Sequence, residues 1–209
     1  MSQDDYVHLI LPGQPGGPLL FVFHGTGGSE QQFPTLGREL LPTATIVSPR
    51  GDVSEHGAAR CFRRTAEGVY DMDDLARAAR KMAGFVSAHV ERAGAEATFA
   101  LGYSNGANIL AATLFLEPDL FDRVVLMHPL IPFEPHVAGS IAGKPVLVTA
   151  GRRDPICPTD VTSRLIAHLR GLEADVVLEW HEGGHEIRTS EIDAARRFLS
   201  AGAKAKGDK

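Results

Sequence analysis

Cysteine is scarce in this sequence, and long apolar runs are missing. Only two cysteines occur in 209 residues, too few for the disulfide framework of a small secreted domain. No stretch reaches the roughly 20 apolar residues of a membrane-spanning helix. The first residues are acidic and lack the basic start of a signal peptide. We therefore expect a cytoplasmic protein that does not insert into a membrane.

Excess positive charge is also lacking, since the formal net charge is −5. This argues against nucleic acid or an anionic membrane as the main partner. A chain of this length suits one domain with its own core, which we expect to span residues 1–209. The basic run "AKAKGDK" at the C-terminus indicates a flexible, solvated tail from about residue 202. The oligomeric state, including a homodimer, stays open.

Short apolar runs alternate with segments of helical periodicity. The runs predict strands that are buried on both faces, as in a parallel sheet, near residues 7–11, 19–23, 44–48, 98–103, 124–127, 146–149 and 176–179. Apolar residues recur at three- and four-residue steps in residues 73–92, 161–172 and 192–199, and residues 105–116 form a more apolar segment. The alternation predicts an α/β fold with a mostly parallel sheet of about seven strands and helices on both faces.

The stretch "LGYSNGAN" places Ser104 between Gly102 and Gly106. It fits the pattern G-x-S-x-G, and it stands between a predicted strand and a predicted helix, the context of a nucleophile on a sharp turn. Glycines leave room for such a turn. The pentapeptide is also compatible with an ordinary glycine-rich loop, so the reading depends on partners elsewhere.

A serine nucleophile needs a base and an acid that orients the base. After Ser104, the segments "VLVTAGRRDPICP" and "VLEWHEGGHEI" each join a strand to a loop, and the loops carry Asp154 and His185. Taken alone, Asp154 before Pro155 could start a turn, and His185 could be a surface residue. The order Ser, Asp, His after successive strands favours a catalytic triad.

The segment "HGTGG" follows another predicted strand and contains small residues that let the backbone approach a ligand. We assign the oxyanion-binding amides to Thr26 and to Asn105, the residue after the serine. His24 is expected to brace this loop. A phosphate-binding loop is disfavoured because the Gly-Lys-Ser/Thr ending is missing.

The segment "HEGGH" matches the zinc-protease pattern H-E-x-x-H. That site requires His181 and His185 on one helical face, but two glycines and a preceding strand oppose a helix here. We therefore predict no metal ligands, and no metal or organic cofactor.

These motifs resemble those of α/β-hydrolases in the phospholipase/carboxylesterase family, particularly bacterial hydroquinone-stress-type carboxylesterases. The resemblance rests on "HGTGG", "SPRGDVSEHGAARCFRRTAEGVYDMDDL", "GYSNGAN", "HPLIPFEP", "GRRDPICP" and "GGHEI", which span most of the chain. It implies Ser104, Asp154 and His185 as the triad, and Thr26 and Asn105 as the oxyanion positions.

The resemblance also bears on the substrate pocket. Larger α/β-hydrolases carry a helical cap after the strand that follows the nucleophile helix, but here "HPLIPFEPHVAGSIAGKP" is too short for one. We expect an open site whose apolar pocket involves Leu130, Ile131, Ile156 and Phe62. The charged residues between Arg60 and Asp74 either line the mouth of the site or pair with one another, and pairing is the more ordinary outcome.

The sequence thus predicts a serine carboxylesterase that hydrolyses short-chain or aryl esters of small molecules through an acyl-enzyme. The same triad would serve a thioesterase or a carbon–carbon hydrolase of ring-fission products. A dienelactone hydrolase of the usual type is less favoured, because a serine stands where its cysteine nucleophile would be. A binding protein on a retired hydrolase scaffold is a further alternative.

Overall fold

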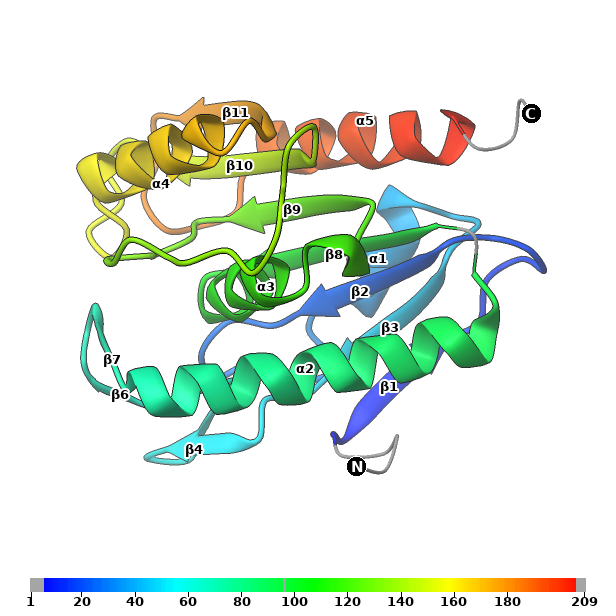
Figure 1. The fold of residues 1–209 in the computed structure, drawn as a ribbon, viewed down its shortest axis with the longest axis horizontal. Coiled ribbons are helices and arrows are strands. Elements are labelled where there is room, and N and C mark those ends of the chain that lie inside the picture. The colour runs from blue at the N-terminus through cyan, green and yellow to red at the C-terminus, as the bar shows by residue number, and fades with distance from the viewer. Residues whose placement is uncertain (1–5, 96, 206–209) are drawn as a thin grey trace.

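A seven-stranded sheet forms the centre of the molecule, in the order β1-β3-β2-β8-β9-β10-β11 (Figure 1). The structure is a computed structural model that describes residues 6–95 and 97–205. The strands of the sheet are β1 (His8–Leu11), β2 (Leu19–Phe23), β3 (Thr45–Pro49), β8 (Thr98–Tyr103), β9 (Arg123–Met127), β10 (Pro145–Gly151) and β11 (Asp175–His181). β1 is antiparallel to β3, and every other neighbouring pair is parallel. The predicted mostly parallel sheet is confirmed.

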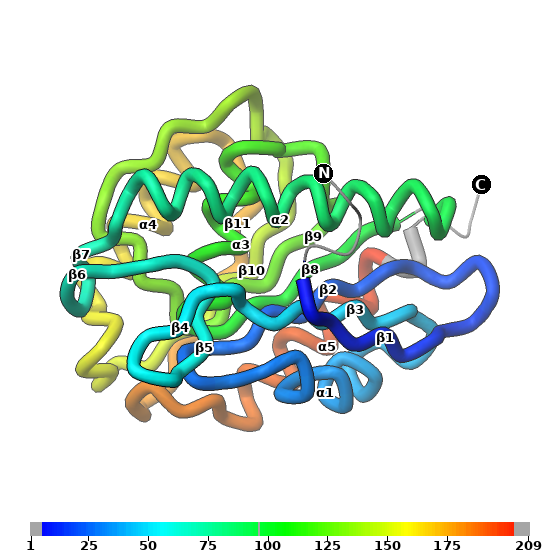
Figure 2. Tube along the Cα trace, turned by 90° about the horizontal axis from the view of Figure 1, so that it is seen from below, coloured from blue at the N-terminus to red at the C-terminus, as the bar shows by residue number. Residues whose placement is uncertain are grey.

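Helices cover both faces of this sheet (Figure 2). α2 (Met72–Ala93), α3 (Asn105–Leu116) and α4 (Thr159–Gly171) pack on one face, and α1 (Pro34–Leu40) and α5 (Thr189–Ala205) pack on the other. A short 3₁₀ helix, η1 (Pro118–Leu120), follows α3. The sheet is therefore the middle of three layers.

Each face of the sheet has its own apolar layer, and β2 contributes to both. Leu19, Phe21 and Phe23 belong to the layer under α2, α3 and α4. Leu20 and Val22 belong to the layer under α1 and α5. Side chains alternate between the two faces along a strand. Because helices cover both faces, all five side chains are buried. The continuous apolar run of the sequence results from this two-sided burial.

Local signals set the ends of α2. The Asp71 carboxylate accepts a hydrogen bond from the Asp74 amide at 3.0 Å and caps the first turn. Gly94 ends the helix in the left-handed conformation with φ of 56°. The structure thus agrees with the sequence on this helix within one residue at each end.

Several elements are not predicted by the sequence analysis. They are α1, η1, and two hairpins formed by β4 (Val53–Glu55) with β5 (Ala58–Arg60) and by β6 (Arg64–Ala66) with β7 (Val69–Tyr70). The β6–β7 hairpin lies at the end of the molecule where the parallel strands finish (Figure 1). At the C-terminus, α5 continues through residues 202–205, which the sequence assigned to a tail, while residues 206–209 lie outside the described residues.

In residues 128–144, between β9 and β10, the structure contains no helix or strand. The expected absence of a helical cap at this position is met. Among the described helices, none is long and apolar enough to span a bilayer.

Candidate active site

Ser104 occupies a strained turn between β8 and α3. Its φ of 51° and ψ of −116° are unusual for a residue with a side chain. A Cβ atom on Gly102 would lie 2.4 Å from the Gly106 carbonyl oxygen, and one on Gly106 would lie 2.2 Å from the Phe23 carbonyl oxygen. Both glycines of the motif are therefore required by close backbone approach, and the turn presents Ser104 at the N-terminus of α3.

The structure brings Ser104, His185 and Asp154 together from three strand ends. The Ser104 Oγ lies 2.9 Å from His185 Nε2, and His185 Nδ1 lies 2.7 Å from Asp154 Oδ2. A carboxylate only accepts hydrogen bonds, so Nδ1 carries the imidazole proton and donates it to Asp154. The Nε2 lone pair then faces the serine hydroxyl, the arrangement that a general base requires.

Asp154 is held as a carboxylate by four donors. Its Oδ1 accepts the amides of Ile156 and Cys157 at 2.8 and 2.9 Å, and its Oδ2 accepts from both His185 and His128. Burial favours the neutral acid, but the hydrogen bonds from the two histidines and the two amides outweigh it. The pKa of Asp154 consequently lies below its ordinary value.

The loop that carries His185 is fixed to the neighbouring strand ends. Tyr103 donates its hydroxyl to the His185 carbonyl oxygen at 2.7 Å, and its ring lies 5.3 Å from the imidazole. The Arg153 amide donates to the Gly183 carbonyl oxygen at 2.9 Å. These contacts fix the imidazole position relative to Ser104 and Asp154.

The loop of Thr26 is braced by the buried ring of His24. Its Nδ1 donates to the Gly25 carbonyl oxygen at 2.7 Å, and its Nε2 accepts the Gly51 amide at 2.8 Å. Desolvation lowers the pKa of His24, so the ring remains neutral in this bracing role. Within the described residues, neither the Thr26 nor the Asn105 amide donates a backbone hydrogen bond outside the regular helices and strands.

A side chain and a backbone amide from the β5 region contact the two oxyanion candidates. The Arg60 guanidinium, 3% exposed, donates to Thr26 Oγ1 at 2.8 Å and lies 3.5 Å from the Glu55 carboxylate. The Cys61 amide donates to Asn105 Oδ1 at 2.8 Å. The segment 58–61 thereby connects the Thr26 loop to the start of α3.

Other charged side chains between Arg60 and Asp74 form ion pairs. Pairing is the more ordinary of the two outcomes considered from the sequence. Arg63 contacts Asp71 and Asp74, and Arg64 contacts Glu55 and Glu67. Their charge is therefore largely compensated by carboxylates of the β4–β7 segment and of the start of α2, and we assign them no substrate role.

The four predicted pocket residues differ in their exposure. Phe62 is fully buried in the core, with its ring 4.8 Å from that of Tyr70, and it presents no surface to an open pocket. Leu130 and Ile131 are also buried, whereas Ile156 is 37% exposed. Tyr70, which packs against Phe62, belongs to a hairpin that the sequence analysis did not predict.

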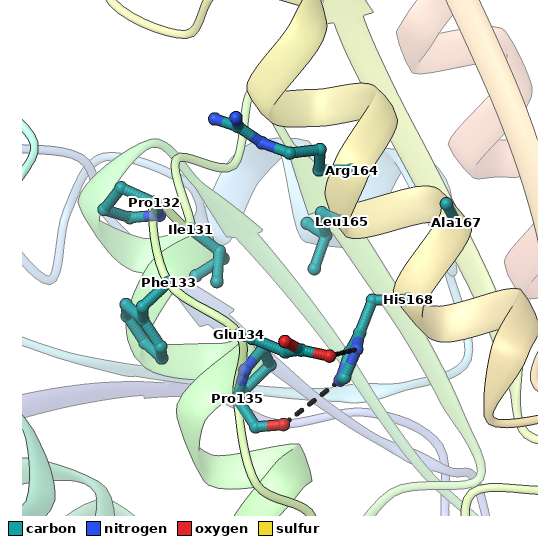
Figure 3. Close-up of a pocket in the computed structure, with 9 residues that line it drawn as sticks. All are labelled: Ile131, Pro132, Phe133, Glu134, Pro135, Arg164, Leu165, Ala167 and His168. Carbon is teal, nitrogen blue, oxygen red and sulfur yellow. Dashed lines mark hydrogen bonds and ion pairs between the residues drawn. The ribbon is translucent and has the colours of Figure 1, made fainter.

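A cavity of about 480 Å³ lies between the 131–135 loop and α4 (Figure 3). Ile131 and Leu165 line it together with Glu134 and His168, whose Nε2 contacts the Pro135 carbonyl oxygen at 3.1 Å. Ser104 and His185 are not among its lining residues. It is therefore separate from the Ser104–His185–Asp154 cluster.

Sequence reasoning missed a buried histidine beside Asp154 and a buried glutamate beyond it. His128 Nδ1 lies 2.9 Å from Asp154 Oδ2, and its Nε2 lies 3.0 Å from Glu191 Oε1. A signal for each exists in the chain. His128 directly follows β9, as Ser104 directly follows β8, and Glu191 stands in the apolar stripe of α5 one turn before Ala195.

Two groups of histidines and carboxylates in the described residues have ligand atoms close enough to hold a metal: His128, His181 and Glu191, and His128, Asp154 and His185. In the first group, His181 Nδ1 accepts the Gly183 amide at 2.9 Å, so Nε2 carries the proton. A protonated nitrogen is not a metal ligand. In the second group, both histidines already donate to Asp154. The segment 181–185 is not helical, so the zinc-protease geometry does not form.

Comparison with known proteins shows the family of this chain. Residues 57–200 match the dienelactone hydrolase family. The chain belongs to this family. "Putative hydrolase MhqD" of Bacillus subtilis (strain 168) is 36% identical over 182 residues, which cover 86% of this chain and 91% of that protein.

Two solved structures are similar to this chain over nearly its whole length. The Bacillus cereus carboxylesterase is 32% identical with a TM-score of 0.89, covering 95% of both chains. The protein Atu2452 from Agrobacterium tumefaciens str. C58, of unknown function, is 56% identical with a TM-score of 0.91, covering 96% of this chain and 98% of that one. The chain is thus a hydrolase with the α/β-hydrolase fold, and the expected resemblance to carboxylesterases is confirmed.

Proposed function

We propose that this protein is a serine carboxylesterase that hydrolyses short-chain or aryl esters through an acyl-enzyme. The observation that carries the proposal is the continuous series from Ser104 Oγ through His185 to Asp154, with contacts of 2.9 and 2.7 Å. The similarity to the Bacillus cereus carboxylesterase supports the same reaction class.

In the first half-reaction, His185 Nε2 takes the Ser104 proton as the oxygen attacks the ester carbonyl. Negative charge develops on the carbonyl oxygen, and the amides of Thr26 and Asn105 stabilise it. The protonated His185 then donates to the leaving alcohol. Water repeats the sequence on the acyl-enzyme and releases the acid.

Asp154 stays ionised through both steps. Its four hydrogen bonds hold the carboxylate in place, and its charge stabilises the imidazolium that forms on His185. The reaction needs no metal or organic cofactor. The 37% exposure of Ile156, next to Asp154, supports an open apolar contact for a small acyl or alcohol group.

The test is steady-state hydrolysis of p-nitrophenyl acetate and butyrate by the wild type, Ser104→Ala and the control Ser163→Ala, which changes an exposed serine of α4. We expect turnover by the wild type and the control, and background rates for Ser104→Ala. Equal activity of all three would reject Ser104 as the nucleophile. Turnover confined to thioesters or vinylogous diketones would favour the thioesterase or carbon–carbon hydrolase alternative.

A further inference from the structure

His128 is fully buried directly beyond β9, where its ring lies between two carboxylates. Its Nδ1 is 2.9 Å from Asp154 Oδ2, and its Nε2 is 3.0 Å from Glu191 Oε1. The first contact is an aligned hydrogen bond, and the second is an ion pair without that alignment. A neutral imidazole has one N–H, so it would set a nitrogen lone pair against one of these anions.

The carboxylate beyond His128 is itself tightly held. Glu191 Oε1 accepts the Thr149 hydroxyl at 2.5 Å, and Oε2 accepts the Arg188 amide at 2.7 Å. His181 Nε2 lies 3.1 Å from the same Oε2. The Thr149 hydroxyl and the Arg188 amide favour the ionised form of Glu191, which is wholly buried, whereas the His181 contact is not an aligned hydrogen bond.

The backbone of His128 is held in a conformation that directs its ring toward Asp154. His128 has φ of 51°, which is uncommon for a residue with a side chain. Its amide donates to the Thr149 carbonyl oxygen at 2.8 Å, and its carbonyl oxygen accepts from Cys157 Sγ at 3.2 Å. The uncommon φ of His128 thus occurs at the position where its ring contacts Asp154.

We propose that His128 is a cationic positioning residue that links Asp154 to Glu191 and sets the charge available to His185. This inference rests on the proposed function. The buried series then alternates in sign, as Asp154 carboxylate, His128 imidazolium and Glu191 carboxylate, with a net charge of one negative unit at rest. When His185 takes the Ser104 proton, the cluster becomes neutral. With a neutral His128, two uncompensated negative charges would remain buried.

The surroundings of the ring define what else can influence it. The imidazole of His185 lies 5.1 Å away, that of His181 lies 5.4 Å away, and the Tyr103 ring lies 5.8 Å away. The titratable groups that face His128 are therefore Asp154, Glu191, His181, His185, Tyr103 and Cys157. Two of these are carboxylates, and both touch the ring nitrogens.

The experiment combines ¹⁵N NMR of the histidine rings with kinetics of four variants: His128→Gln, Glu191→Gln, the double variant, and His181→Gln. His181→Gln is the matched control, because it alters a contact of Glu191 without touching Asp154. In the wild type at neutral pH, we expect both ring nitrogens of His128 to be protonated. In Glu191→Gln, the titration of His128 should move to lower pH.

His128→Gln should lower kcat about tenfold or more with KM little changed, and it should move the acid limb of kcat/KM upward by about one pH unit. The His128 cation opposes protonation of His185. Its removal lets His185 become protonated at higher pH, so the acid limb moves upward. The double variant removes one charge of each sign and should recover part of kcat. His181→Gln should leave the acid limb unchanged.

A neutral His128 in an active wild type would overturn the inference alone. So would a His128→Gln enzyme whose activity falls only in proportion to its thermal stability, with the acid limb unmoved. A wild type that hydrolyses no ester would instead overturn the proposed function, and this inference with it. The NMR measurement needs no variant, so a misfolded His128→Gln protein does not protect the proposal.

Discussion

Gly151 and Gly184 lie in direct backbone contact, such that a Cβ atom on Gly151 would sit 2.1 Å from the Gly184 carbonyl oxygen. Gly151 ends β10 three residues before Asp154, and Gly184 directly precedes His185. The two loops that carry the acid and the base are therefore packed against each other without side chains between them. The distance between these two loops determines the distance between Asp154 and His185.

The contact predicts the effect of Gly151→Ala. The added methyl group must push the two loops apart, which lengthens the Asp154–His185 hydrogen bond and misplaces the base. We expect kcat on p-nitrophenyl acetate to fall about 10²-fold, as for a displacement of about 1 Å, together with a lower Tm. The control is Gly84→Ala, where the methyl group meets no atom within 4 Å on the exposed side of α2. It should leave kcat unchanged; an equal loss in both variants would contradict the role of this contact.

The acid side of the activity profile follows from the protonation states of the site. Hydrolysis requires neutral His185, so kcat/KM should fall on the acid side of the profile. The pKa of Asp154 lies below its ordinary value because of its four hydrogen bonds, so Asp154 should add no second limb above about pH 4. The measurement is kcat/KM from pH 4 to 9, corrected for spontaneous ester hydrolysis. A rate that stays constant down to pH 4 would exclude His185 as the base.

Protein stability should depend on pH through His128. Burial opposes protonation, but Asp154 and Glu191 raise the pKa of His128 to about 9, from 6.5 for an unperturbed histidine. The folded state thus keeps a proton that the unfolded chain releases as the pH rises. This stabilisation is complete below about pH 6.5 and is lost as the pH passes through about 9, with a magnitude of about 3 kcal/mol.

Urea unfolding at pH 6.5 and 9.5 measures this dependence. The wild type should lose stability over that interval, and His128→Gln should lose much less. His136→Gln, which changes an exposed histidine, is the control and should follow the wild type. If His128→Gln and the wild type lose the same free energy of unfolding, His128 does not carry the proton.

The cysteines should be inert in the folded protein. Burial raises the pKa of Cys61 to about 12 and raises the pKa of Cys157 above its ordinary value. Since the thiolate is the reactive form, iodoacetamide at pH 7.5 should leave activity intact and should modify both thiols only after denaturation. Stoichiometric inactivation that substrate prevents would indicate a cysteine nucleophile, the alternative disfavoured by Ser104.

The sequence predicted the central sheet because β2, β8, β9 and β10 are continuous apolar runs buried on both faces. It did not predict the β4–β5 and β6–β7 hairpins, whose strands are only two or three residues long. Strands this short carry no readable period. The Arg64–Glu55 pair connects the two hairpins through a tertiary contact.

In the site too, the sequence predicted some residues and missed others. Ser104, Asp154 and His185 follow strands in an order that the chain displays, so the sequence could nominate them together. The Glu191–His128 contact joins α5 to the end of β9 across 63 residues, and no local pattern encodes that pairing. The full burial of Phe62, whose ring packs against Tyr70 of the β6–β7 hairpin, is likewise a tertiary feature.

The central claim is that His185 and Asp154 activate Ser104 as a nucleophile. Its most direct test is intact-protein mass spectrometry after treatment with a fluorophosphonate, followed by peptide mapping of the adduct. We predict one phosphonyl group per chain, located on Ser104, with no labelling of Ser104→Ala and greatly slowed labelling of His185→Gln. An unlabelled wild type, or an adduct on another residue, would contradict the account.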